Sequence, residues 1–199
     1  FSQQEPRLLV HFASLTNGGL KGSKEFVQAY TENPLTDFHQ MVAEIASSPS
    51  EQITRFHAKT INLSIMYGAG QNKLAEQLDI DVETVKEILL QYHARVPFVK
   101  RLQDAVNGAN IRRAYIWRAL NRLIQSSAAD MTKQCMVKIW EALGELPLIQ
   151  IHDELAFSVP DLERAKEVCS VMQTAVPIEV PTPAQISLGD TWGQLDKIR

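Results

Sequence analysis

Apolar residues recur at intervals of three and four along most of the chain, which is the spacing that places them on one face of an α-helix. This pattern predicts helices over residues 7–15, 24–30, 37–46, 54–67, 74–80, 82–96, 99–106 and 115–143. Asp81 is the expected N-cap of the helix over 82–96, and Pro97 is expected to end it. Glycines at Gly68 and Gly70 mark a C-terminal cap or hinge after the helix over 54–67.

The C-terminal quarter has a different pattern. Two short apolar runs flank His152 and Asp153, which predicts a β-hairpin over residues 147–159 with charge at its tip. A helix is expected over 162–174, followed by one strand-like run within 178–190 whose prolines suit a sheet edge. The sequence therefore predicts an α+β fold, mostly helical around a small antiparallel sheet.

Composition narrows the class of protein. The chain has 199 residues, of which 45% are hydrophobic and 22% charged, as in soluble globular domains of one large or two small units. No apolar run approaches the roughly 20 residues of a membrane span, and the first residues lack a signal-peptide pattern. We expect a cytoplasmic protein with no membrane partner. Cys135 and Cys169 have neither zinc-ligand nor disulfide-framework spacing.

The net charge of −3 is unevenly distributed. Residues 55–133 are basic, whereas both flanking segments are acidic. Within the basic segment, six cations are opposed only by Asp104; they are Lys100, Arg101, Arg112, Arg113, Arg118 and Arg122. Such a cluster suits an anionic nucleic-acid backbone, and it equally suits a solvated helix surface, so charge alone leaves both interpretations open.

One stripe of side chains suggests nucleotide chemistry. Arg55, Lys59, Leu63 and Tyr67 recur every fourth residue, so a helix places them on one face. Arginine and lysine bind phosphate oxygens, and a tyrosine ring can stack on a base. The alternative is an ordinary amphipathic helix with a solvated basic edge.

A second candidate lies at the hairpin tip. Asp153 and Glu154 are adjacent carboxylates between apolar runs, and two ionised carboxylates repel each other unless a cation or solvent compensates. Mg²⁺ prefers carboxylate oxygens and often keeps waters and substrate phosphates as further ligands. The pair therefore indicates a metal site, with a plain polar turn as the alternative.

Three motifs in order carry a resemblance to a known family. RFHAKTINLSIMYGAG resembles the fingers-helix motif of family A DNA polymerases, the bacterial DNA polymerase I class. LIQIHDELAF is similar to their metal-binding palm hairpin, and FSQQEPRLLVHFA to the stretch that follows their first catalytic aspartate. TDFHQMVAE, NRLIQSSAADMTKQCMVKIW and GDTW extend the likeness over essentially the whole chain. The QQEPR segment is more similar to bacteriophage members of the family. A phage-encoded protein would act in the cytoplasm of its host.

The resemblance implies a fold and an activity. It implies a polymerase right hand that lacks thumb and exonuclease domain, with residues 1–15 beginning the palm, 16–115 forming the fingers and 116–199 completing the palm. The implied activity is template-directed addition of dNTPs to the 3′-hydroxyl of a primer in DNA replication, by phosphoryl transfer with two Mg²⁺ ions. The alternative is a non-catalytic DNA- or nucleotide-binding module from a degenerate or split polymerase.

The resemblance also assigns roles to matching residues. Asp153 is the implied metal ligand, with Glu154 assisting and Lys59 as a catalytic cation. Implied nucleotide contacts are Arg55, Lys59, Leu63, Tyr67, Glu5 and Gln3, where Glu5 is the gate against a ribose 2′-hydroxyl. Implied contacts to primer-template DNA are Asn121, Gln125, His152 and Arg7.

Three departures from the family pattern modify these expectations. The family's first metal-ligating aspartate would immediately precede Phe1, so we expect this chain to hold half of the carboxylate pair and to need an upstream thumb and palm segment, in cis or in trans, for activity. The stretch between Val99 and Asn121 is shorter than in relatives. Leu63 occupies a position that is commonly Phe or Tyr in relatives. The resemblance implies that the nucleotide pocket senses the sugar at this position.

Overall fold

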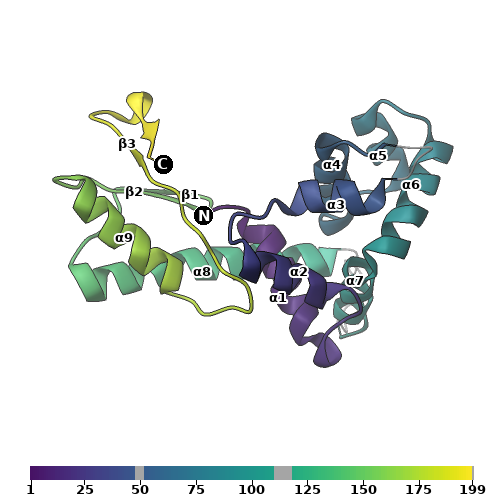
Figure 1. Ribbon diagram of the computed structural model, residues 1–199, viewed down its shortest axis with the longest axis horizontal. Helices are drawn as coiled ribbons and strands as arrows, with labels where there is room; N and C mark the ends of the chain where they lie inside the picture. The colour runs from purple at the N-terminus through teal and green to yellow at the C-terminus, as the bar shows by residue number, and fades with distance from the viewer. Residues whose placement is uncertain (48–51, 110–117, 199) are drawn as a thin grey trace.

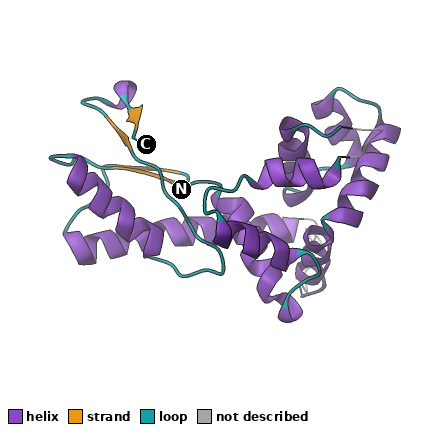
Figure 2. Ribbon diagram, viewed as in Figure 1, coloured by secondary structure: helices purple, strands orange, loops and turns teal. Residues whose placement is uncertain are grey.

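The computed structural model describes residues 1–47, 52–109 and 118–198, and most of these residues are helical (Figures 1 and 2). The helices are α1 (Gln4–Leu15), α2 (Ser23–Glu32), α3 (Phe38–Ala46), α4 (Arg55–Met66), α5 (Gln71–Leu78), α6 (Val82–Arg95), α7 (Pro97–Ala109), α8 (Ala119–Leu143) and α9 (Leu162–Thr174). The strands are β1 (Ile149–Ile151), β2 (Glu154–Ala156), β3 (Ser187–Leu188) and β4 (Asp196–Lys197). The predicted α+β class with mostly helical content is confirmed.

Helix starts follow the capping chemistry of the sequence. The side chain of Asp81 accepts a hydrogen bond from the Thr84 N–H at the start of α6, as predicted, and Asp37, Thr54 and Asp161 cap α3, α4 and α9 in the same way. Helix α4 ends before Gly68, whose φ is 69°. The helix predicted over 115–143 is described from Ala119 onward, and the first part of that prediction lies outside the described residues.

The strands form two separate two-stranded sheets within the described part of the chain. β1 and β2 pair antiparallel as predicted, with Ile151 opposite Glu154 and a two-residue turn of His152 and Asp153 between them. His152 has a φ of 52°, a left-handed conformation that is uncommon for a residue with a side chain. The second sheet pairs β3 with β4, and β4 was not predicted because two residues give no detectable pattern.

Two apolar clusters hold the elements together. The larger one is built by α1 to α7 and the first half of α8, and its ring contacts include Phe26 at 5.3 Å from Phe38 and 5.1 Å from Phe98 between centroids. The smaller cluster lies between α8 and α9 and includes Cys135, Ile139, Val168 and Met172. Each fully buried side chain of this size contributes about 1.5–3 kcal/mol. The two clusters meet along α8, which runs through both.

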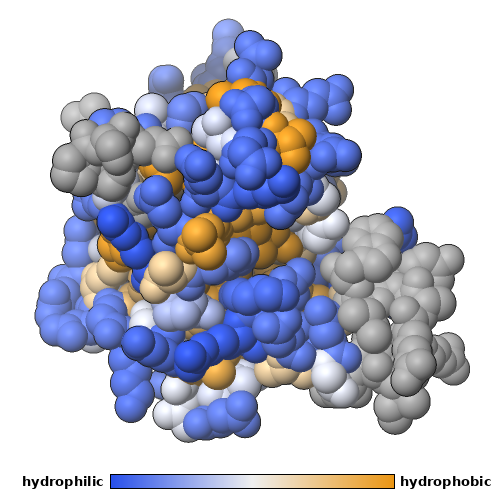
Figure 3. Space-filling model, turned by 90° about the vertical axis from the view of Figure 1, so that its right-hand side faces the viewer, coloured by the Kyte–Doolittle hydropathy of each residue, from blue (hydrophilic) through white to orange (hydrophobic). Residues whose placement is uncertain are grey.

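The outer face over α4, α5 and α6 is mostly hydrophilic, with hydrophobic residues gathered in a hollow near its middle (Figure 3). This distribution is what amphipathic helices produce when their apolar stripes face inward. Among the described residues, no helix combines the length and the apolar character that crossing a membrane requires.

Candidate functional site

A cavity of about 660 Å³ opens where the start of α1, the residue after α4, the middle of α8 and the tip of the β1–β2 hairpin meet. Six predicted site residues line it: Gln3, Glu5, Tyr67, Gln125, His152 and Asp153. They come from four segments that are far apart in the sequence, so the fold itself assembles this group. Gln4, Pro6, Ala128, Ala129 and Gln150 complete the lining.

Glu5 and Tyr67 are joined inside this cavity. The Tyr67 hydroxyl donates a hydrogen bond of 2.9 Å to Oε2 of Glu5, which links the end of α4 to the start of α1. Partial burial and this bond to Glu5 raise the pKa of Tyr67 to about 12, while a side-chain hydrogen bond with Gln125 acts in the opposite direction. Tyr67 is therefore neutral near pH 7, and Glu5 is held by a partner from another helix.

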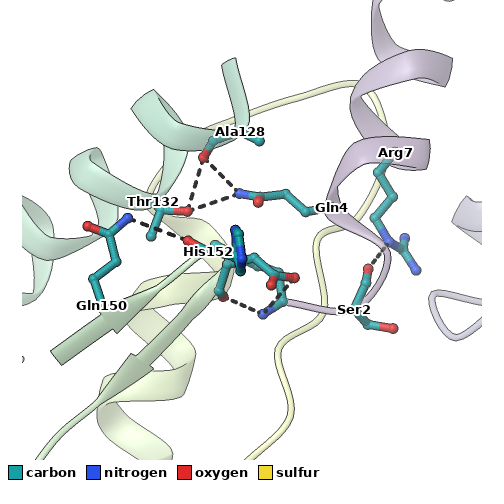
Figure 4. Close-up of polar contacts among 9 residues, drawn as sticks. Ser2, Gln4, Arg7, Ala128, Thr132, Gln150 and His152 are labelled. Carbon is teal, nitrogen blue, oxygen red and sulfur yellow. Dashed lines mark hydrogen bonds and ion pairs between the residues drawn. The ribbon is translucent and has the colours of Figure 1, made fainter. Parts of the chain in front are cut away.

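Gln4 fixes α1 against α8 beneath the cavity (Figure 4). Its side-chain amide donates to the Ala128 carbonyl at 3.1 Å and to Oγ1 of Thr132 at 3.2 Å. Both partners and Gln4 itself are buried, so the bonds lie in a region of low dielectric. Gln4 was not predicted from the sequence, because a glutamine in a helix carries no signal that distinguishes a buried amide from a solvated one.

The hairpin tip presents Asp153 to the same cavity. The backbone nitrogen of Phe1 donates to the Asp153 carbonyl at 2.9 Å, and that nitrogen lies 3.9 Å from the Asp153 carboxylate. The side chain of Asp153 is 40% exposed. The side-chain amide of Gln150 donates to the His152 carbonyl at 3.4 Å, near the limit of a hydrogen bond (Figure 4). Together these contacts hold the turn at the cavity wall.

Glu154 lines a second cavity of about 400 Å³ rather than the first, and Asp153 borders both. Among the described residues, no group of three or more His, Cys, Asp or Glu side chains is arranged to hold a metal ion. Mg²⁺ is commonly bound through one or two carboxylates together with waters and substrate phosphates. The half-exposed Asp153 carboxylate therefore fits one ligand position of such a site.

The rest of the predicted α4 stripe lies outside the 660 Å³ cavity. Arg55 is paired with Asp37 through two contacts to Oδ2, at 2.7 Å from Nε and 2.6 Å from Nη2. Partial burial opposes ionisation of Asp37, but its bonds with Arg55 and with backbone N–H groups lower its pKa overall. Lys59 is exposed and makes no ion pair within the described residues, and Leu63 is half-buried. Of the four residues in this stripe, only Tyr67 lines the cavity.

A buried polar chain orients α4. The Asn62 side-chain amide contacts Nδ1 of His39 at 3.0 Å, and the Tyr92 hydroxyl donates to Oδ1 of Asn62 at 2.5 Å. Burial lowers the pKa of His39 to about 4, with smaller effects from Asp37, Arg55 and Lys59. His39 is therefore neutral near pH 7 and lies within electrostatic reach of both cations of the stripe. No sequence signal had singled out His39 or Asn62.

Arg7, a predicted DNA contact, lies in the interior of the described structure. Arg7 is 1% exposed, and its guanidinium lies 4.2 Å from the ring centroid of Tyr30. All its hydrogen bonds are internal, to the carbonyls of Ser2 (2.8 Å), Pro34 (2.7 Å) and Pro181 (2.5 Å). Arg7 is thus a structural cation that ties three segments together. Asn121, another predicted DNA contact, does not line the cavity, and its Oδ1 is buried without a partner in the described part of the chain.

Comparison with known proteins decides the family. The sequence model of DNA polymerase family A matches residues 1–117 and 104–194. The chain belongs to DNA polymerase family A. This family A chain is 32% identical to the DNA-directed DNA polymerase of Pseudomonas phage M6 over 97% of its own length and 37% of the phage protein. It is 26% identical to the thermostable DNA polymerase I of Thermus aquaticus, over 96% of the chain and 26% of that protein.

A solved structure agrees with this assignment. The POL domain of Pol1 from M. smegmatis, in complex with DNA primer-template and dNTP, superimposes with a TM-score of 0.74 at 28% identity, over 91% of this family A chain and 37% of that one. The chain thus spans about a quarter to just over a third of these relatives. The phage alignment covers 254 positions, more than the chain has residues, so the phage polymerase contains residues without a counterpart here. The two family matches overlap at 104–117, inside the stretch predicted to be shorter.

Proposed function

We propose that this chain is the palm and fingers portion of a template-directed DNA polymerase, which adds dNTPs to the 3′-hydroxyl of a primer in DNA replication. The observation that carries the proposal is the cavity that unites Glu5, Tyr67, Gln125 and Asp153, because these are residues for which the family resemblance implies contacts to nucleotide, DNA or metal. Family membership and the likeness to a polymerase domain bound to primer-template and dNTP support it.

In this proposal the first cavity receives the new base pair. Tyr67 presents a neutral phenol next to the pair, and Gln125 and His152 contact the DNA near the primer end. Glu5 lies where it excludes a ribose 2′-hydroxyl. Its carboxylate accepts a hydrogen bond from Tyr67, so moving the carboxylate aside would break that bond. Gln3 is held beside it, because its side-chain oxygen accepts a 2.9 Å hydrogen bond from the Phe38 N–H.

Asp153 is the proposed protein ligand for Mg²⁺. When bound, the metal would neutralise charge on the triphosphate and favour the ionised form of the primer 3′-hydroxyl. The contribution of Asp153 is a carboxylate held at a fixed place by the hairpin turn and by the Phe1 contact. Glu154 would assist from the neighbouring position, and the second carboxylate of the pair would come from the upstream palm segment, in cis or in trans.

The exposed face of α4 is the proposed triphosphate site. Lys59 is exposed and takes part in none of the salt bridges among the described residues, so its charge is available to an anionic ligand. Arg55 would have to release or share Asp37 in order to bind phosphate. Leu63 lies one turn from Lys59 and would border the sugar.

The remaining parts of the proposal concern organisation. We assign residues 1–15 and 116–199 to the palm and 16–115 to the fingers, and we assign primer-template DNA and dNTPs as partners. A thumb and palm segment upstream would hold the duplex. The place of action that this function requires is a compartment with DNA and dNTPs, such as the cytoplasm of a bacterial host.

The second candidate is a non-catalytic module that binds DNA or nucleotide. The observation that favours it is that Glu154, the carboxylate next to Asp153, lines the second cavity and not the one that Asp153 shares with Glu5, Tyr67 and Gln125. In that case the cavity and Lys59 would still bind substrates, but no nucleotide would be added.

A chimeric polymerase separates the two candidates. This chain would replace the matching segment of the Pseudomonas phage M6 polymerase, whose remaining residues supply the upstream part. The polymerase proposal predicts template-directed, Mg²⁺-dependent primer extension by the chimera. Binding of primer-template without extension, by a folded chimera, would contradict it and favour the binding module.

A further inference from the structure

Asp37 uses both of its carboxylate oxygens to join the starts of two helices. It is the N-cap of α3, where Oδ1 accepts hydrogen bonds from the His39 and Gln40 N–H groups at 2.9 and 3.1 Å. Oδ2 accepts from Nε of Arg55, the first residue of α4, at 2.7 Å and lies 2.6 Å from its Nη2. The two helices lie side by side (Figure 1), so one carboxylate links a helix cap to a cation of the proposed triphosphate site.

This contact uses only one edge of the Arg55 guanidinium. Nε and Nη2 form the side-on edge of the group, whereas Nη1 and the outer N–H of Nη2 form a second, end-on edge. Within the described residues, Nη1 of Arg55 makes no hydrogen bond, and the side chain is half exposed. Because a guanidinium has five N–H donors in a fixed fork, Arg55 can bind Asp37 and a phosphate group at the same time.

Arg55 occupies a helix position that is unfavourable for a cation. The N-terminus of a helix carries partial positive charge, so a cation in the first turn is disfavoured unless an anion lies beside it. Asp37 supplies that anion, and its own position is fixed by the bonds that cap α3. A forked contact to a fixed carboxylate holds the guanidinium in one orientation.

Lys59 adds a second positive charge on the same face of α4, one turn from Arg55. Burial is the largest cause of the lowered pKa of His39; Asp37 acts against it, and Arg55 and Lys59 lower that pKa further. His39 is neutral near pH 7, so this group of side chains contains two cations and one carboxylate. The excess of positive charge suits a phosphate, and Asp37 offsets only part of it.

We propose that Asp37 is a positioning residue, which holds Arg55 by its side-on edge so that the end-on edge binds a phosphate of the incoming dNTP. This inference deepens the proposed function and rests on it. In this arrangement Asp37 strengthens phosphate binding, because the Arg55 side chain has little freedom left to lose when the phosphate binds. The opposite arrangement is a competition, in which Arg55 must leave Asp37 first and the carboxylate weakens phosphate binding.

Substitutions that keep the α3 cap isolate the contact with Arg55. Asp37→Asn retains an acceptor for the N–H groups of α3 but loses the charge, and Asp37→Ser caps the helix with a side chain too short to reach Arg55. Asp81→Asn is the matched control, because Asp81 caps α6 through Thr84. Calorimetric titration of the 199-residue chain with inorganic triphosphate measures the affinity, and the urea midpoint of each variant checks its folding.

We expect both Asp37 variants to bind triphosphate about threefold to tenfold more weakly than the wild type, and Asp81→Asn to bind as the wild type does. In an Arg55→Ala background the loss should disappear, because removal of the carboxylate then removes only its repulsion of the anion.

Three results would overturn the positioning proposal. They are unchanged or stronger binding by the Asp37 variants, an equal loss in the Arg55→Ala background, and no triphosphate binding by the wild type. The titration involves no primer, template or nucleotide addition, so its outcome is separate from that of the polymerase proposal, which fails if a folded chimera binds primer-template without extending it.

Discussion

The hydroxyl of Tyr67 and the carboxylate of Glu5 form a 2.9 Å hydrogen bond although the residues are 62 positions apart. The bond connects the end of α4 with the start of α1 across the mouth of the cavity that Asp153 also lines. It fixes the carboxylate at the place where, in the proposed function, a ribose 2′-hydroxyl would have to enter. The arrangement explains how a glutamate in a first helical turn could act as a rigid gate.

Replacing Glu5 with Ala in the active chimera is expected to admit ribonucleotides. The change frees the space beside Tyr67, so the ratio of kcat/KM for dNTP to that for rNTP should fall by at least about tenfold, with some loss in dNTP addition. Steady-state primer extension with each nucleotide measures it. Tyr67→Phe is the matched control, since it removes the same hydrogen bond but keeps the Glu5 side chain. An unchanged ratio for Glu5→Ala would reject the gate.

The buried His39 predicts acid sensitivity of the fold. Its pKa is about 4 in the folded protein and about 6.5 when unfolded, so the unfolded chain binds a proton that the folded chain does not. This contribution to stability is present above about pH 6.5 and is lost as pH falls toward 4, by at most about 3 kcal/mol. Urea unfolding of wild type and His39→Gln at pH 7 and pH 4.5 should show a smaller loss in the variant, which keeps a side chain able to accept from Asn62. Parallel losses would contradict the assignment.

Arg7→Ala should destabilise the protein without a specific effect on DNA. The change leaves three partly buried carbonyls short of a donor and removes the contact with Tyr30, which together should cost about 3 kcal/mol. Urea unfolding measures the loss, with Arg101→Ala on the exposed face of α7 as the control. Unchanged stability together with weakened primer-template binding would restore Arg7 as a DNA contact.

Lys59→Ala in the chimera should raise KM for dNTP and also lower kcat. A cation on the triphosphate acts in the ground state and in the transition state, so both parameters respond, with kcat/KM falling by about a hundredfold. Lys73→Ala on α5 removes an exposed positive charge of the same type and should change neither. If Lys59→Ala altered only the affinity for primer-template, Lys59 would belong to the DNA surface instead.

Local chemistry made much of the fold predictable. The caps at Asp81 and Thr54, the stop after Met66 and the two-residue turn at His152 are encoded by residues next to one another in the chain. Their preferences for N-caps, left-handed caps and turns act within a few residues, so a pattern in the sequence is sufficient. The pairing of β3 with β4 involves only two residues on each strand and left no pattern to detect.

The candidate site was predictable only in part. Motif spacing identified Glu5, Tyr67 and Asp153, because the family resemblance names these positions, but it could not show that Tyr67 bonds to Glu5. The internal role of Arg7 depends on carbonyls of Pro34 and Pro181, which the fold brings together from distant segments. Burial of a charged side chain by remote parts of the chain has no local signature, so the internal position of Arg7 could not be predicted from sequence.

The most direct test of the account is primer extension by the chimera carrying Asp153→Ala. The account predicts that extension falls by at least about a hundredfold while affinity for primer-template changes less than about threefold, because the carboxylate positions metal rather than DNA. Asp130→Ala, which removes an exposed carboxylate of α8 at 3.6 Å from Lys133, should retain full activity. Substantial extension by Asp153→Ala would contradict the central claim that the hairpin carboxylate belongs to the catalytic site.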